Sequence, residues 1–157
     1  KHDAKDREFL DKNKITHVLL AAAPLKKVYD NIHYKKLKIY DNTAFDITPF
    51  FPKGFKFIYK YHRRGKNVLV HCKGGRSRSP SVVIGYLMFV KRWDFKQAHD
   101  YVKEKRDVID INKAFEQQLI FFKKAVEEYY KIIDERVKNA KKLEEGQDLG
   151  EENKSGD

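Results

Sequence analysis

The segment His71-Cys72-Lys73-Gly74-Gly75-Arg76-Ser77-Arg78-Ser79 decides how this sequence folds and where its chemistry lies. Directly before it, Val68-Leu69-Val70 is a short apolar run, rich in β-branched residues, that predicts a central, fully buried strand. Directly after it, Pro80 follows Ser79 as the first residue of a helix follows its N-cap. The segment therefore predicts an α/β unit with Cys72 at the carboxyl end of a strand, where such sheets bind ligands.

The spacing from Cys72 to Arg78 favours a loop that binds an anion. Gly74 and Gly75 let the backbone curl until successive N–H groups point to one centre, and the following helix adds the positive end of its dipole. Such donors lower the pKa of a thiol, so Cys72 is expected to be a nucleophile near neutral pH. Arg78 has the planar fork that binds two phosphate oxygens. A buried core cysteine beside a glycine turn is the alternative, which the agreement of all these features disfavours.

The other residues of the segment have supporting roles in this prediction. Ser79 can donate a hydrogen bond to the Cys72 sulfur, which stabilises the sulfur as a leaving group. His71 is expected to fix the loop rather than to act as a base, because the thiolate forms without one. Lys73 and Arg76 are expected to extend their side chains at the rim. The predicted substrate-binding residues are Lys73, Gly74, Gly75, Arg76, Ser77 and Arg78.

The signature His-Cys-x2-Gly-x2-Arg-Ser resembles that of the dual-specificity branch of the cysteine-dependent protein tyrosine phosphatase superfamily, especially its small atypical members. Arg106-x2-Ile109 and Asn112-x2-Phe115 are similar to the family's closing helices, although Asp107 and Ile111 stand where prolines are usual. The resemblance implies a mostly parallel or mixed β-sheet flanked by helices. It also implies hydrolysis of phosphotyrosine and of phosphoserine or phosphothreonine in proteins through a cysteinyl-phosphate intermediate. Asn112 is expected to support the residues that contact the substrate without contacting the substrate itself.

The family places a general acid, an aspartate, in a loop about thirty residues before the cysteine. Asp41 follows a predicted strand over Leu37-Lys38-Ile39-Tyr40 and opens a polar turn, so it is the expected acid. Asp46 is the rival, but its position three residues before Pro49 suits a helix cap. The alternative for Asp41 is that it only initiates the turn.

Hydrophobic periodicity predicts the remaining elements. Helices are expected over residues 6–13, 51–64, 80–90 and 95–105, and a strand over residues 16–20. A long helix is expected to start near Asn112, because apolar residues then repeat at alternating spacings of four and three as far as Ile133. The predicted domains are a catalytic domain over residues 1–133, without the family's N-terminal strand, and residues 134–157, a helix extension that becomes an acidic disordered tail past Gly146.

Length and composition indicate what class of protein this is and where in the cell it is expected. A chain of 157 residues with 41% hydrophobic residues fits one globular domain and is not wholly disordered. It has no apolar stretch that could span a bilayer or act as a secretory signal. A single cysteine cannot form an internal disulfide, so a cytoplasmic or nuclear location is expected.

The net charge of +11 predicts an anionic partner. A phosphoprotein substrate is expected first and an anionic lipid is possible. Nucleic acid is not expected, because the cations are not interleaved with aromatic residues in one motif. An oligomer through the C-terminal helix is also possible. No His, Cys and carboxylate cluster has the spacing of a metal site, so no metal or other cofactor is expected.

Two further enzymatic functions remain open at this point. Lys73 and Arg76 resemble cations in the loops of phosphoinositide and phosphatidylglycerophosphate phosphatases, so the alternative function is a lipid phosphatase. The second open function is hydrolysis of RNA 5′-triphosphates, which a related fold carries out. A non-catalytic phosphate reader is disfavoured, because such proteins usually lose the cysteine or the acid, and this sequence has both.

Overall fold

The computed structural model describes the backbone of residues 3–151 and the side chains of residues 4–143. The chain forms two compact units, Lys1–Lys123 and Lys124–Asp157. The elements in chain order are η1 (Asp3–Lys5), α1 (Arg7–Lys12), β1 (Ile15–Ala21), β2 (His33–Leu37), η2 (Thr48–Phe50), α2 (Phe51–His62), β3 (Asn67–His71), α3 (Arg78–Lys91), α4 (Phe95–Lys105) and α5 (Lys113–Glu151). This α/β arrangement agrees with the predicted fold class.

The sheet has three parallel strands in the order β2-β1-β3. Its register pairs Ala21 with Leu37 and Leu20 with His71, so the carboxyl ends of all three strands meet at one edge of the sheet. Cys72 follows His71 and lies at this edge, where the sequence placed it. β1 and β3 contain the predicted runs 16–20 and 68–70.

The prediction that residues 68–70 form a central, fully buried strand is wrong for the described residues. β3 pairs with β1 alone and its residues 68–71 are half-buried. The apolar run therefore reflects packing against the helices and not a neighbouring strand on each side. The strand predicted over residues 37–40 is also displaced, because β2 ends at Leu37. His33, Lys35 and Lys36 are exposed in this edge strand. Because these residues are polar, the strand has no apolar run by which it could be predicted.

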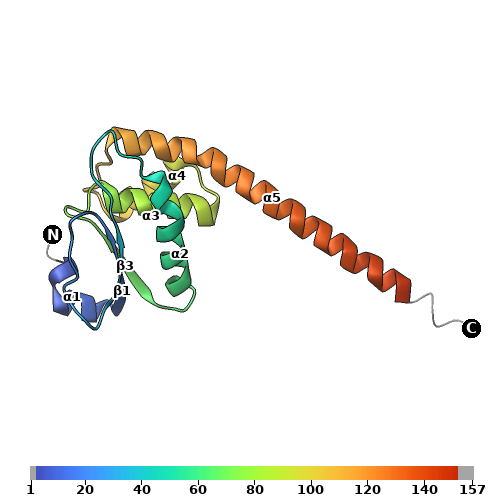
Figure 1. The fold of residues 1–157 in the computed structure, drawn as a ribbon, viewed down its shortest axis with the longest axis horizontal. Helices are drawn as coiled ribbons and strands as arrows, with labels where there is room; N and C mark the ends of the chain where they lie inside the picture. Colours follow the sequence, from blue (N-terminus) through green and yellow to red (C-terminus); the bar gives the residue numbers. More distant parts are fainter. Residues whose placement is uncertain (1–2, 152–157) are drawn as a thin grey trace, which may run out of the picture. The chain divides into compact units, whose positions relative to one another are not determined.

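Helices cover both faces of the sheet (Figure 1). α2 and α3 pack on one face over the larger core, which includes Leu19, Leu37 and Phe55. α1 lies over the other face, where Leu10 and Val18 belong to a smaller core. The predicted helices over residues 6–13, 51–64 and 95–105 agree with α1, α2 and α4 within two residues at each end. This packing holds the carboxyl edge of the sheet against the start of α3.

α3 begins two residues earlier than the predicted start, with Ser77 as its N-cap. Ser79 and Pro80 therefore lie in its first turn, where proline is tolerated because the first N–H groups have no partner inside the helix. The Ser79 hydroxyl consequently does not cap the helix.

α5 starts one residue after Asn112, close to the predicted start, and runs to Glu151. Residues 147–151, predicted as disordered, are helical, because extending a helix by one residue is much easier than starting one. The rest of the predicted tail, residues 152–157, lies outside the described residues. The predicted domain boundary after residue 133 stays a prediction.

Candidate active site

Cys72 stands at the centre of a group of hydrogen-bond donors. Its Sγ accepts bonds from the Ser79 hydroxyl at 3.3 Å and from the Gly75 N–H at 3.2 Å. Burial by itself raises the pKa of the Cys72 thiol. The bonds from the Ser79 hydroxyl and N–H, the Gly75 N–H and the charge of Arg78 outweigh burial, so the net pKa lies below that of an ordinary thiol. The arrangement favours the thiolate, the form that attacks phosphorus.

Gly75 is the glycine that this loop requires. Its φ is +66°, in the left-handed region, and a Cβ there would lie 2.9 Å from a guanidinium nitrogen of Arg106. Gly74 has neither a positive φ nor a close neighbour in this direction, so the geometry requires glycine at position 75 and not at position 74.

His71 supports the loop from behind. Its Nδ1 lies 3.2 Å from the Cys72 carbonyl oxygen, which can only accept a hydrogen bond, so Nδ1 is the donor. Burial lowers the pKa of His71, and the bond to Cys72 opposes that shift. A neutral imidazole that donates to the backbone fits the expected loop-fixing role.

Arg78 and Asp41 form an ion pair beside the nucleophile. Arg78 Nε lies 3.4 Å from Asp41 Oδ2, and this buried Nε has no hydrogen-bond partner among the described residues. A buried guanidinium donor rarely lacks a hydrogen-bond partner, and this one fits an oxygen of a bound anion. The structure thus brings the expected acid to the phosphate-binding arginine.

Asp41 is also held by two neutral donors. Ser77 Oγ donates to its Oδ1 at 2.8 Å and Asn112 Nδ2 donates to the same oxygen at 3.1 Å. Ser77 therefore uses its side chain to position Asp41, a contact that the predicted substrate-binding role did not include. The rival Asp46 accepts bonds from the N–H and hydroxyl of Thr48 at the start of η2, which fits the cap expected there.

The connection between α4 and α5 braces the loop from outside. Arg106 Nε donates to Gly75 O at 3.1 Å, and the Asp110 N–H donates to Arg76 O at 2.9 Å. The Asn112 N–H approaches Ser77 Oγ at 3.3 Å, so three consecutive loop residues contact this connection. Arg106 and Asp110 were not among the site residues predicted from the sequence. Arg106 belongs to the family pattern Arg106-x2-Ile109, so it could have been predicted as a site residue. Nothing in the sequence indicates that Asp110 lies at the site.

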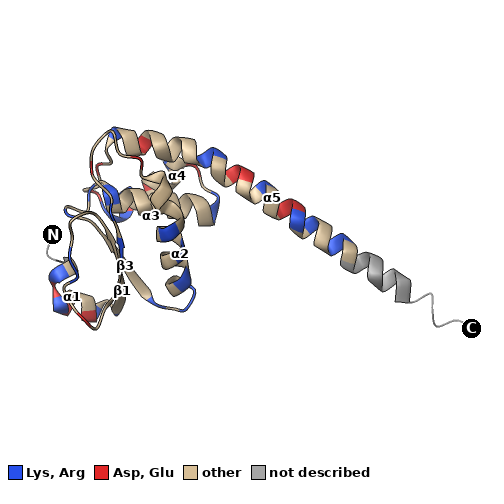
Figure 2. Cartoon of the chain, viewed as in Figure 1, with Lys and Arg blue, Asp and Glu red and all other residues tan. Residues whose placement is uncertain are grey.

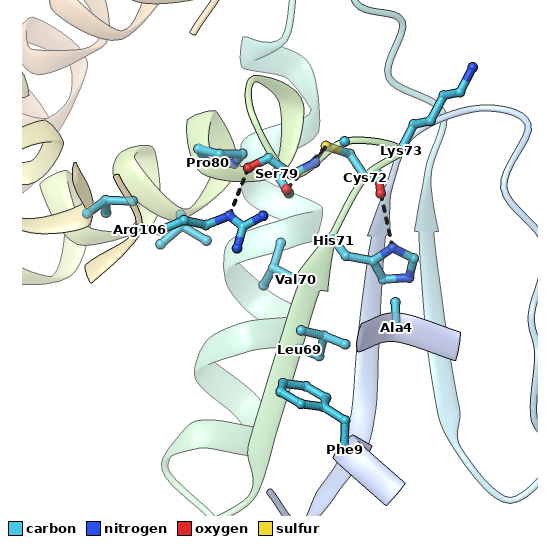
Figure 3. A pocket seen from close by; sticks show the side chains of 14 residues that line it. Ala4, Phe9, Leu69, Val70, His71, Cys72, Lys73, Ser79, Pro80 and Arg106 are labelled. Carbon is cyan, nitrogen blue, oxygen red and sulfur yellow. Dashed lines mark hydrogen bonds between the residues drawn. The ribbon is translucent and has the colours of Figure 1, made fainter. Parts of the chain in front are cut away.

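Lys73 and Arg76 both have exposed side chains, as expected of residues at the rim. Figure 3 shows the Lys73 side chain directed away from His71 and Arg106. Arg76 pairs with Asp110 at 3.1 Å, so part of its charge is already offset.

A cavity of about 270 Å³ adjoins the loop, with Phe9, Leu69 and Val102 among its lining residues (Figure 3). Cys72, Gly75 and Ser79 also line this cavity, so it reaches the nucleophile, whereas Asp41 and Arg78 do not line it. Among the described residues no group of three or more His, Cys, Asp or Glu side chains could hold a metal ion. No helix in this part of the chain is long and apolar enough to cross a membrane.

Comparison with known proteins agrees with this geometry. The family model of the dual specificity phosphatase catalytic domain matches residues 1–125. The chain belongs to this family. Human dual specificity protein phosphatase 22 is 34% identical over 122 residues, which are 78% of this chain and 66% of that protein. The crystal structure of DUSP15 superposes with a TM-score of 0.77 at 30% identity, covering 85% of this chain and 86% of that one. The matched region is thus a dual-specificity protein phosphatase domain of the metal-independent type.

Two further comparisons bear on what the whole protein does. Protein phosphatase Slingshot of Drosophila melanogaster is 34% identical over 143 residues, which are 90% of this chain but 13% of that protein. This chain therefore spans a small part of that relative. The crystal structure of PTPMT1 in complex with PI(5)P has a TM-score of 0.69 at 25% identity, covering 79% of this chain and 86% of that one.

Ser79→Ala is expected to raise the pKa of the Cys72 thiol, because the variant loses the hydroxyl that stabilises the thiolate. The rate of alkylation by iodoacetate, followed against pH, should reach its midpoint at a higher pH than in the unmodified protein. Ser81→Ala is the matched control, since Ser81 is buried in the same helix and donates to Ser77 O instead of Cys72. Equal profiles for Ser79→Ala and the unmodified protein would contradict the assignment.

Proposed function

We propose that this protein hydrolyses phosphate monoesters on phosphotyrosine and on phosphoserine or phosphothreonine residues of proteins, through a cysteinyl-phosphate. The observation that carries the proposal is the Asp41–Arg78 pair beside a Cys72 sulfur that accepts two hydrogen bonds. A nucleophile, an anion-binding guanidinium and a proton donor are the groups that this reaction needs. Membership of the family supports the same activity.

In the first step the Cys72 thiolate attacks phosphorus, the S–P bond forms and the bond from phosphorus to the leaving oxygen breaks. Asp41 in its protonated form gives its proton to that oxygen, while Arg78 holds two of the phosphoryl oxygens. In the second step water attacks phosphorus, Asp41 takes a proton from the water and the S–P bond breaks. The Ser79 hydroxyl donates to the departing sulfur, so the thiolate returns as a stabilised leaving group.

The positions of the other residues support roles around these three. Ser77 and Asn112 hold the carboxylate of Asp41, and His71 holds the backbone at Cys72. The proposal places the enzyme in the cytoplasm or nucleus, because a lone thiolate nucleophile needs a reducing compartment. Oligomerisation through α5 stays a prediction. The exposed side chains of Tyr129 and Val137 would belong to the apolar contact surface.

One panel of substrates tests the proposal. The purified chain is assayed with a phosphotyrosine peptide, its phosphothreonine counterpart and a phosphoinositide, with phosphate release as the readout. We expect turnover of both peptides, unchanged by a metal chelator. Activity on the phosphoinositide alone would replace the protein-phosphatase proposal with the lipid one.

A polyanionic substrate is the second candidate. Lys73 and Arg76 are exposed next to the loop, and PTPMT1, a structural neighbour, was crystallised with PI(5)P. The ion pair of Arg76 with Asp110 weakens this candidate, because a second phosphate must compete with a carboxylate for the same guanidinium. A doubly phosphorylated peptide and a phosphoinositide present the same chemistry to the rim.

Changing Lys73→Ala together with Arg76→Ala is expected to leave turnover of a small aryl phosphate within about tenfold, because rim contacts are screened by solvent. Turnover of a doubly phosphorylated peptide or of PI(5)P should fall further, and its dependence on salt should flatten. The measurement is kcat/KM for each substrate at two salt concentrations. Asp110→Asn is the matched variant, because it removes the charge opposite Arg76 and should shift selectivity toward the polyanion. An equal loss on small and polyanionic substrates would assign Lys73 and Arg76 to loop structure.

A further inference from the structure

The exposed side of α2 carries a row of cations. Lys53, Lys56, Lys60 and Arg63 follow one another at spacings of three, four and three residues, which places them along one side of the helix. All four are exposed, and we refer to them as the α2 basic stripe. Figure 2 shows α2 with Lys and Arg and without Asp or Glu. None of the four forms an ion pair with any residue whose side chain the structure describes.

Other surface helices offset their cations one turn away. Each has a lysine or arginine that pairs with an acid three or four residues further on: Arg7 with Asp11 in α1, Lys96 with Asp100 in α4 and Lys113 with Glu116 in α5. α2 has no acid to use, because the sequence contains no Asp or Glu between Asp46 and Asp94. Over the same interval it contains Lys53, Lys56, Lys60, Arg63, Arg64, Lys66, Lys73, Arg76, Arg78, Lys91 and Arg92.

The N-terminal half of the stripe, Lys53 and Lys56, does not stabilise its own helix. Like charges three and four residues apart repel one another along a helix surface. Lys53 also lies in the first turn of α2, next to the positive end of the helix dipole, where a cation is disfavoured. Lys60 and Arg63 lie at the C-terminal end of α2, where cations suit the helix dipole, so helix stability accounts for these two. It does not account for Lys53 and Lys56, whereas a partner of opposite charge accounts for all four.

The neighbouring edge strand adds to the same surface. His33 stacks on Phe57 of α2, and Leu37 lies next to Gly54 of α2. Because alternate residues of a strand share a face, Lys35 lies on the α2 side of β2, and it is exposed. Leu37 also ends β2 at the carboxyl edge of the sheet, so the Lys53 end of the stripe is at the same edge as Cys72.

We propose that the α2 basic stripe docks an acidic segment of the protein substrate. From Lys53 to Arg63 the stripe is about 15 Å long, which an extended peptide covers with about five residues. An anionic side chain on alternate residues of such a segment would meet the cations in turn. The inference rests on the proposed function, because the docked segment belongs to the protein whose phosphate reaches Cys72.

A membrane or a nucleic acid fits the stripe less well. Helices that bind a bilayer surface insert an apolar face, but the apolar face of α2, including Phe51 and Phe55, is already buried in the core. Single-stranded nucleic acid needs open aromatic rings for stacking. Tyr59 is exposed here, but the guanidinium of Arg63 lies over its ring at 5.6 Å.

The test measures binding without turnover, so its failure is separate from a failure of the proposed function. The probe is a fluorescein-labelled peptide of about ten glutamates, followed by anisotropy at about 50 mM salt with saturating vanadate present. The variant is Lys53→Glu with Lys56→Glu. Its matched control is Lys12→Glu with Lys27→Glu, which changes the net charge equally at exposed positions outside α2.

The unmodified chain and the control should bind the peptide with affinities within about twofold of each other, and the α2 variant about tenfold or more weaker. The thermal midpoint of the α2 variant should not fall, since a glutamate at position 53 suits the helix dipole and one at position 56 faces Lys60. An equal loss in the α2 variant and the control would show that only net charge matters, and would overturn the proposal. Tighter binding to phosphatidylserine vesicles or to single-stranded RNA, lost in the same variant, would overturn it in favour of those partners.

Discussion

Cys72→Ser should abolish phosphate release, with a loss of about a thousandfold or more, because a hydroxyl in this position is a far weaker nucleophile than the stabilised thiolate. The sulfur accepts bonds from Gly75 and Ser79, and a hydroxyl oxygen can accept the same two. The loop should consequently keep its shape. The measurement is kcat/KM on a phosphotyrosine peptide, the substrate class proposed above.

Two controls accompany the Cys72→Ser measurement. The thermal midpoint should stay close to that of the unmodified protein, and the variant should still bind the phosphopeptide, since Arg78 and the backbone donors are unchanged. Turnover within about tenfold of that of the unmodified protein would show that Cys72 is not the nucleophile.

Asp41→Asn should slow substrates with poor leaving groups by about a hundredfold to ten-thousandfold, the usual contribution of a general acid. Peptide phosphotyrosine and phosphothreonine belong to this class. An aryl phosphate with an acidic leaving group needs no proton, so its turnover should fall much less. The measurement is the ratio of kcat/KM for the two substrate types.

Asp46→Asn is the matched control for that ratio. Both aspartates lie in the loop region between β2 and α2, but Asp46 bonds to Thr48 whereas Asp41 bonds to Ser77, Asn112 and Arg78. A selective loss in Asp46→Asn with none in Asp41→Asn would move the acid to Asp46. A loss of equal size on both substrates in Asp41→Asn would indicate that the carboxylate only positions Arg78.

Much of the site could be predicted from the sequence because its central part is one continuous segment. Strand, loop and helix start follow one another between residues 67 and 80, so Cys72, Gly75, Arg78 and Ser79 are brought together by local chain geometry. Such geometry depends on backbone preferences and spacing, which a sequence shows directly. The α/β class followed for the same reason, from the alternation of apolar runs and helical periodicity.

Only the tertiary structure decided which residues surround Asp41 and how the loop is braced. The contacts of Asp41 with Ser77 and Asn112 span 36 and 71 residues, and Arg106 reaches Gly75 across 31 residues. Hydrogen bonds over such separations depend on the paths of loops that no local pattern specifies. The position of β2 and the edge location of β3 could not be predicted from the sequence for a related reason. Whether a strand is buried depends on its neighbours in the sheet, and those neighbours are fixed by pairing between distant segments.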